Sequence, residues 1–306
     1  MIQHVPTERR VDAGSVSLGC LEYGCADARP LLMFHGLADS AWSLDPLAQE
    51  LAAHFHVFSF DLRGHGRSDW GAYTLAHLVG DIRGVVETLD VVDPILVGHS
   101  LGGQSAAQFC GLYPELPRAL VLLEALGPPP NRKAEADPDG HQREYFRHIT
   151  EMVRQPAKHR VQPDLETAVA RFRSVHPLLS EERARFLVEK NTLEQAEGER
   201  EWRLDPDTRD WLAGHDFQRA EQRWGGVTCP TLAVLGTDSW DRFWQPNMIM
   251  SADLDGPMSD AELQRRLSKF ADARHVMLEG AGHMLHYDQP EALNNVVVDF
   301  LGRLST

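Results

Sequence analysis

The chain has 306 residues, 42% hydrophobic and 25% charged, which are the proportions of a soluble globular protein with a large buried core. Its formal net charge of −15, from 45 acidic and 30 basic residues, disfavours nucleic acid and anionic membrane surfaces as partners. No apolar run approaches the roughly 18 residues of a membrane span, and the N-terminus lacks the basic head and apolar core of a secretory signal. We therefore expect a cytoplasmic protein that binds neither membrane nor nucleic acid.

The sequence carries no visible cofactor or metal signature. Its four cysteines have neither metal-ligand spacing nor the density of a disulfide framework: Cys20, Cys25, Cys110 and Cys229. Cys20 and Cys25 bracket a strand and a turn and could pair, but we expect the reduced state of a cytoplasmic chain. No nicotinamide, flavin or phosphate-loop motif is present. We expect no cofactor and no metal, and the sequence does not indicate an oligomeric state.

In the first part of the chain, short apolar runs alternate with segments of helical periodicity. Strands are predicted at 16–23, 31–34, 56–60, 94–97 and 119–123. Helices are predicted between them, at 42–53, 74–89 and 103–113. Strands that are apolar throughout and alternate with helices indicate a mainly parallel sheet covered on both faces. In such sheets ligands bind beyond the carboxyl ends of the strands.

The composition changes at Gly127-Pro128-Pro129-Pro130, which is a stiff exit from the core. From there to Gly225-Gly226 the signals are helical and charged, with candidate helices at 141–154, 164–174, 180–196 and 206–222. Core-like elements then return, as strands at 231–235 and 274–278, a helix near 259–270 and a terminal helix opened by Pro290. We interpret 128–226 as a helical cap domain over the active site, set into a core of residues 1–127 and 227–306. The alternative is an insertion without a role at the site.

Aromatic residues of this segment could line a pocket for an acyl group, although each could instead pack in the core of the cap. They are Tyr145, Phe146, Phe172, Phe186, Trp202 and Trp211.

The motif Gly98-His99-Ser100-Leu101-Gly102 lies between a predicted strand and a predicted helix. A serine in this position, with glycines two residues before and two after, fits a nucleophile elbow. The turn would strain the serine backbone, and side chains larger than glycine would collide with the neighbouring strand and helix. The Ser100 hydroxyl would then stand at the helix N-terminus, where the N–H of Leu101 and the helix dipole can stabilise an oxyanion.

With three further motifs, the sequence resembles the α/β-hydrolase fold superfamily, in particular its serine esterase and lipase-like members with a helical cap. Residues 31–37 resemble the oxyanion strand and loop, residues 61–69 the loop after the fourth strand, and residues 280–283 the catalytic-histidine loop. The likeness covers 15–127 and 227–304. It implies an α/β fold with a mostly parallel central sheet flanked by helices and a helical cap inserted after strand six. Haloalkane dehalogenases and epoxide hydrolases of this fold have aspartate where this chain has Ser100, so both activities are disfavoured.

A serine nucleophile needs a base, and His283 is the best candidate. It follows a strand in the glycine-rich loop Gly280-Ala281-Gly282 and lies far downstream of the serine, as the chain order of this fold requires. His286 is its nearest rival. The resemblance places the oxyanion-hole donors on the backbone of Leu37 and Leu101. We expect structural roles, bracing the loops around the site, for His35, Asp61, Arg63, His65 and Asp69.

Two positions compete for the triad acid. Glu124 lies directly after the strand that follows the elbow helix, which resembles the glutamate placement in some dehalogenases and lactone hydrolases of the fold. Asp238 lies just past the glycine that ends strand 231–235, and Asp241 is a third candidate. We favour Glu124; the alternative is that its carboxylate only caps the strand.

These motifs predict a cofactor-independent serine hydrolase that cleaves a carboxylic ester or lactone through an acyl-enzyme on Ser100. The expected partner is a small-molecule substrate with an apolar acyl or alcohol part. The same residues could serve carbon–carbon bond hydrolysis, perhydrolysis or acyl transfer. A weakly catalytic, ligand-binding member of the fold is a further alternative.

Overall fold

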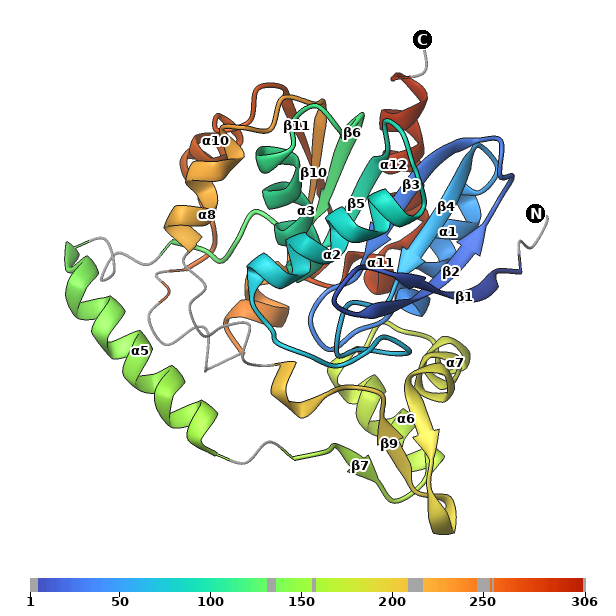
Figure 1. Cartoon of the computed structure of the whole chain (residues 1–306). Helices are drawn as coiled ribbons and strands as arrows, with labels where there is room; N and C mark the ends of the chain where they lie inside the picture. The colour runs from blue at the N-terminus through green and yellow to red at the C-terminus, as the bar shows by residue number, and fades with distance from the viewer. Residues whose placement is uncertain are drawn as a thin grey trace.

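The computed structural model describes residues 5–130, 136–155, 158–208, 217–246, 254 and 256–304. Within these residues, eight strands form one central sheet in the order β1-β2-β4-β3-β5-β6-β10-β11 (Figure 1). In chain order they are β1 (Thr7–Asp12), β2 (Ser17–Tyr23), β3 (Arg29–Phe34), β4 (Phe55–Phe60), β5 (Ile95–His99), β6 (Ala119–Leu123), β10 (Thr231–Gly236) and β11 (Ala273–Leu278). β1 and β2 are antiparallel to their neighbours, and every pair from β4 to β11 is parallel. The predicted mostly parallel sheet is confirmed.

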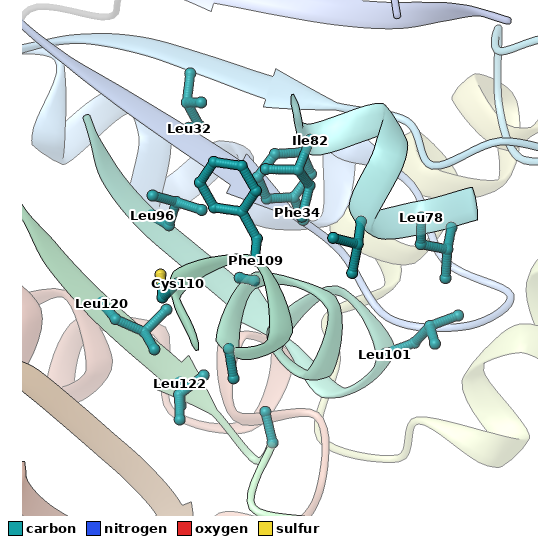
Figure 2. Close-up of a cluster of buried hydrophobic side chains, with 14 of the residues drawn as sticks. Leu32, Phe34, Leu78, Ile82, Leu96, Leu101, Phe109, Cys110, Leu120 and Leu122 are labelled. Carbon is teal, nitrogen blue, oxygen red and sulfur yellow. The ribbon is translucent and has the colours of Figure 1, made fainter. Parts of the chain in front are cut away.

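The central strands are buried on both faces because apolar side chains occupy consecutive positions. Leu32 and Phe34 of β3 point to one face, where Leu96 of β5 and Phe109 of α3 (Ser100–Leu112) pack against them (Figure 2). Leu31 and Met33 point to the other face. The register aligns Phe34 with Phe60 and Gly98, so the strands on either side of β3 end beside it.

Helices cover both faces of the sheet (Figure 1). One face packs against α2 (Leu75–Thr88), α3, α8 (Phe217–Trp224) and α10 (Asp260–Leu267). The other packs against a short 3-10 turn (Ala41–Leu44), α1 (Asp45–Leu51), α11 (Leu285–Asp288) and α12 (Pro290–Gly302). The Thr74 side chain caps α2, and Pro290 stands in the first turn of α12. Among the described residues, no helix combines the length and the apolar composition needed to cross a bilayer.

The N-terminal strand β1 is not predicted from the sequence. Its residues are charged and mostly exposed, so the segment lacks the apolar alternation of a core strand. Pairing with β2 and an ion pair of 2.8 Å between Arg9 and Glu22 hold it at the edge of the sheet.

The segment between β6 and β10 is less helical than the sequence predicts. Its helices are α5 (Pro138–Arg154), α6 (Leu165–Val175), α7 (Glu181–Asn191) and α8. The predicted helix 180–196 ends at Asn191, and β8 (Thr192–Glu194) and β9 (Arg200–Trp202) follow it. They join β7 (Val161–Gln162) in a three-stranded antiparallel sheet. A short 3-10 turn (Ala196–Gly198) links β8 to β9, with Glu197 and Gly198 at positive φ, a conformation that breaks a helix. Residues 209–216 of the predicted helix 206–222 lie outside the described residues.

Part of this insert packs on the core. Ala184, Leu187 and Val188 of α7 share a buried cluster with the α1 face of the sheet. Arg183 donates to the carbonyl of Trp42 at 2.7 Å. Lys190 lies over the Trp42 ring, 4.2 Å from its centroid. In Figure 1, α6, α7 and β9 lie together beyond one end of the sheet, whereas α5 runs apart from it.

Candidate active site

Ser100 lies at the tight turn between β5 and α3. Its φ of +48° is a left-handed conformation, which is strained for a residue other than glycine. The turn requires glycine on both sides, because a side chain on Gly98 would collide with Gly103 and one on Gly102 with the carbonyl of Phe34. The predicted strained turn with two close-packed glycines is confirmed. The Ser100 hydroxyl therefore stands at the N-terminus of α3.

Three of the sequence-predicted residues form one hydrogen-bonded chain. His283 Nε2 lies 3.0 Å from Ser100 Oγ, and His283 Nδ1 lies 3.2 Å from Glu124 Oε2. His283 and Glu124 are buried, whereas Ser100 is partly exposed. In neutral His283 with its proton on Nδ1, the N–H donates to the carboxylate and Nε2 accepts the serine proton. This arrangement can activate a serine as a nucleophile.

The competing carboxylates have other surroundings. Asp238 forms an ion pair of 2.8 Å with Arg242, and its side chain is 34% exposed. Its backbone N–H donates to Ala281 at 2.9 Å, so Asp238 supports the loop that carries His283. Asp241 is exposed. The geometry therefore brings Glu124, and neither aspartate, to His283.

Two buried histidines hold the loop around Leu37. His35 Nε2 accepts from the N–H of Leu62 at 2.9 Å, and His65 Nε2 accepts from the N–H of Ala38 at 3.0 Å. Burial lowers the pKa of both, that of His65 to about 3, so both rings are neutral at pH 7. The Leu37 N–H makes no hydrogen bond to any residue the structure describes.

The loop at residues 61–69 is a hydrogen-bonded scaffold, as predicted. Asp61 accepts from the backbone N–H of Ala41 at 2.8 Å and from that of Arg67 at 2.9 Å. Arg63 makes a buried two-pronged pair with Asp81, at 2.6 and 2.7 Å. Asp69 accepts from the N–H of Ser17 at 2.9 Å. These carboxylates hold the loop to neighbouring segments.

Sequence reasoning missed several residues around His283. The Phe243 ring stacks on the His283 ring, with centroids 4.0 Å apart and planes at 17°. His99 Nε2 lies 2.8 Å from the carbonyl oxygen of His283 and donates to it. Burial holds the pKa of His99 well below its ordinary value. These contacts join distant parts of the chain, so no local sequence pattern marks them.

One group of side chains has the chemistry of metal ligands. Candidate ligand atoms of Asp39, His99 and His286 lie within 4.8 Å of one another. Asp39 already accepts from the Tyr287 hydroxyl at 2.8 Å and pairs with His286 Nε2 at 3.3 Å. The group therefore holds the loop after the oxyanion strand to the loop after His283. His286, the rival candidate for the base, is thus paired with Asp39.

A pocket of about 160 Å³ adjoins the Leu37 loop. It is lined by Leu37, Ala38, Lys158, Arg160, Leu204, Pro206 and Thr208. A larger and more open hollow of about 460 Å³ lies beside β1, but it contains none of the candidate catalytic residues. Of the two, the smaller pocket is the one that includes Leu37, a predicted oxyanion donor, and neither is lined by Ser100 or His283.

Of the six aromatic residues named for an acyl pocket, the four whose side chains the structure describes do not line this pocket. The rings of Phe172 and Trp202 pack together with centroids 5.7 Å apart, and both contact the buried cluster on the α1 face. Phe186 packs against Trp42, and Phe146 is 48% exposed. Trp211 and the side chain of Tyr145 lie outside what the structure describes.

Comparisons with known proteins agree with this fold. The family model described as the alpha/beta hydrolase family matches residues 31–296. A serine hydrolase-like protein of Danio rerio is 25% identical over 91% of this chain and 83% of its own length. A bifunctional esterase/perhydrolase of Acinetobacter calcoaceticus is 36% identical over 41% of this chain, but this match spans only 46% of that enzyme.

Solved structures share the architecture over nearly the full length. The crystal structure of E-2-(acetamidomethylene)succinate hydrolase has a TM-score of 0.75 at 24% identity, covering 97% of this chain and 99% of the other. A thioesterase domain from the curacin biosynthetic pathway has a TM-score of 0.74 at 24% identity, covering 96% and 99%. The chain belongs to the alpha/beta hydrolase family. Its relatives include esterases, thioesterases and other hydrolases.

Proposed function

We propose that this protein is a cofactor-independent serine hydrolase that cleaves a carboxylic ester or lactone through an acyl-enzyme on Ser100. The observation that carries the proposal is the unbroken hydrogen-bonded chain from Glu124 through His283 to Ser100. A buried acid is needed at its far end, because it orients the imidazole and stabilises the imidazolium that forms during the reaction. Glu124 lies at this end of the chain of hydrogen bonds, and its other carboxylate oxygen accepts a hydrogen bond from the Gly236 N–H at 2.7 Å.

In the proposed reaction, Ser100 Oγ attacks the acyl carbon while His283 Nε2 takes its proton. The N–H groups of Leu37 and Leu101 donate to the oxyanion that develops on the carbonyl oxygen. The proton then passes from His283 to the leaving alcohol, which departs and leaves the acyl group on Ser100. Water, activated by His283, attacks the ester of the acyl-enzyme and restores the serine.

We infer that residues 128–226 act as a cap over a core of residues 1–127 and 227–306. Two observations support this role. The pocket at Leu37 and Ala38 is walled by Leu204 and Pro206 of the insert, and α7 is fixed to the core through Arg183. Such a partly enclosed site suits a small molecule, and we propose that its acyl or alcohol part is apolar where it meets Leu204 and Pro206.

Turnover of a panel of short-chain esters and lactones by the wild-type protein and by Ser100→Ala tests the proposal. We expect Ser100→Ala to lower kcat on the order of 10⁶-fold, as in other triad knockouts. The circular dichroism spectrum and thermal midpoint should change little, because Ser100 is partly exposed. Retention of a substantial fraction of the activity in the folded variant would rule out Ser100 as the nucleophile.

The same residues could pass the acyl group to an acceptor other than water. A relative that matches part of this chain is named an esterase/perhydrolase, which makes perhydrolysis the second candidate. Adding hydrogen peroxide to the ester assay distinguishes the two, because a perhydrolase forms the peracid in competition with the free acid. Absence of peracid at high peroxide would leave hydrolysis as the reaction. The same panel tests a mainly ligand-binding role, which predicts no turnover of any member, and a β-diketone added to it tests carbon–carbon bond hydrolysis.

A further inference from the structure

The pocket beside the Leu37 loop has a basic end. Its lining combines Leu204 and Pro206, which are apolar, with Lys158 and Arg160, which come from the segment leading into β7. Leu37 belongs both to this pocket and to the proposed oxyanion hole. A ligand in the pocket therefore lies between the basic pair and the loop of the proposed oxyanion hole, whereas Ser100 and His283 are not among the lining residues.

The local backbone explains why two cations face the same space. In an extended segment, residues two apart project to the same side and the residue between them to the other. Arg160 continues the ladder of the small sheet, since its carbonyl accepts from the N–H of Trp202 at 3.0 Å. His159, between the two cations, instead lies 2.5 Å from Glu201. Lys158 and Arg160 thus point together into the pocket, away from this pair.

Neither cation is neutralised within the part of the chain that the structure describes. No ion pair joins Lys158 or Arg160 to a carboxylate there, although the chain has 45 acidic residues against 30 basic ones. Two half-buried basic residues of the insert do have carboxylate partners, as Arg185 has in Glu166 at 2.7 Å and Arg200 has in Glu194 at 2.9 Å. In a chain with a net charge of −15, two cations left together at a pocket indicate an anion supplied from outside.

We infer that Lys158 and Arg160 bind a carboxylate at one end of the substrate, whose other end carries the bond that Ser100 attacks. A carboxylate matches the fork of an arginine, and the lysine adds a point charge. A phosphate is less well suited, since phosphate sites usually include converging backbone N–H groups and Pro206 in the wall has none. At about 160 Å³ the pocket is smaller than the roughly 300–1,000 Å³ of drug-sized sites, so it fits one end of a small ligand. The predicted substrate class is the half-ester of a short dicarboxylic acid.

Two esters that differ only in charge test the inference. Monomethyl adipate carries a free carboxylate, and dimethyl adipate does not. The rest of the inference builds on the proposed hydrolysis, so binding is measured separately from turnover, by calorimetric titration of Ser100→Ala, which cannot form the acyl-enzyme. We expect monomethyl adipate to bind more tightly than dimethyl adipate, and the difference to shrink in 0.5 M salt because the cations are exposed.

The decisive variant is Lys158→Gln/Arg160→Gln in the Ser100→Ala background. We expect its affinity for monomethyl adipate to fall about tenfold, since two exposed charge pairs are lost, and its affinity for dimethyl adipate to stay within twofold. The matched control is Lys269→Gln/Arg274→Gln, which removes one lysine and one arginine from exposed positions on the core. It should leave both affinities unchanged, which separates a local site from the effect of net charge.

Each outcome decides between the inference and its rivals. Equal loss of affinity in the control, or no loss in the Lys158→Gln/Arg160→Gln variant, would overturn the carboxylate site. Tighter binding of inorganic phosphate than of monomethyl adipate would show that the ligand class is wrong. If the wild-type protein binds monomethyl adipate selectively but cleaves neither ester, the site stands and the proposed function falls. If it cleaves both esters without a preference, the proposed function stands and the site falls.

Discussion

At the scale of single residues, hydrogen-bond partners distinguish the carboxylate that meets His283 from its rival. Glu124 has a φ of +49° directly after β6, and its backbone N–H donates to Val234 of the neighbouring β10 at 2.9 Å. Asp238 follows β10, so both acids leave adjacent strands at the same edge of the sheet. Position after a strand could not separate them, which is why the sequence left two candidates. Their hydrogen-bond partners do separate them, because Asp238 is paired with Arg242.

Substitution of each acid by its amide tests this assignment. We expect Glu124→Gln to lower kcat by up to ~10⁴-fold, because an amide can hold the wrong tautomer of His283 and cannot stabilise the imidazolium. Asp238→Asn, which changes an acid of similar position, should lower kcat by less than about tenfold through its support of the histidine loop. Ester turnover by the two purified variants gives the comparison. The opposite ranking would transfer the role to Asp238.

The buried histidines around the site make stability depend on pH. His65 has a pKa of about 3 when folded, against 6.5 when unfolded, and burial lowers the pKa of His35 and His99 as well. Below pH 6.5 each of these histidines takes up a proton when the protein unfolds, and this uptake favours the unfolded state. Above pH 6.5 there is no uptake, so the folded state is not destabilised by these residues. Stability is therefore lost as the pH falls below 6.5, and for His65 the loss continues to about pH 3, by at most about 1.4 kcal/mol per pH unit for each histidine.

Urea unfolding between pH 8 and pH 4 measures this dependence. We expect the free energy of unfolding to fall steeply below pH 6.5, and His65→Gln to have a shallower fall because one proton uptake is removed. His54→Gln is the control, since His54 is exposed, and it should keep the wild-type slope. A His65→Gln profile parallel to that of the wild type would show that His65 is not buried in its neutral form.

At the scale of elements, α7 connects the insert to the core. Arg183 donates to Trp42 at 2.7 Å and lies 3.4 Å from Asp45, and its side chain is only 22% exposed. Asp45 in turn accepts from the hydroxyl of Tyr23 at 2.9 Å. A partly buried hydrogen bond to a charged group contributes more to the free energy of unfolding than an ion pair in open solvent does. The reason is that water competes less well for the buried partners.

We therefore expect Arg183→Met to lower the free energy of unfolding by about 1–3 kcal/mol. The matched variant Arg185→Met removes an exposed pair with Glu166 on the same helix and should cost less than about 1 kcal/mol. Urea denaturation at pH 7 resolves this difference. Equal losses in the two variants would mean that α7 is held by its apolar face alone.

The elements that could be predicted are those whose own residues determine their conformation. Leu31 to Phe34 forms a buried strand because it is apolar throughout, and the turn at Ser100 forms because only glycine fits at Gly98 and Gly102. β1 could not be predicted, since its charged residues are ordered by pairing with β2. The end of α7 at Asn191 was also missed, because the polar residues after it suit a helix until the turn at Glu197 is known.

The same distinction applies to the site. That Ser100, Glu124 and His283 meet at one edge of the sheet could be predicted, because each of them follows a strand of a parallel sheet. The stacking of Phe243 on His283 and the placement of Lys158 and Arg160 at the Leu37 loop could not. These contacts arise where segments far apart in the sequence meet, and no local pattern encodes them.

At the scale of the whole molecule, the core and the insert divide the proposed work. The sheet edge carries the groups proposed to react, with Ser100 directly after β5 and Glu124 directly after β6. The insert adds the wall of Leu204 and Pro206 and a positive end to the pocket. The surplus of negative charge elsewhere on the molecule does not prevent an anion from binding at this positive end. Exposed charges more than about 10 Å away are screened at ordinary salt.

The central claim is that Ser100 is a nucleophile activated by His283, and covalent labelling tests it most directly. The wild-type protein is treated with a fluorophosphonate, which reacts with activated serines, and the adduct is located by peptide mass spectrometry. We predict one adduct per chain, on Ser100, and much slower labelling of His283→Gln, which keeps the serine but lacks the base. Labelling at another serine, or no labelling of the folded wild-type protein, would contradict the account.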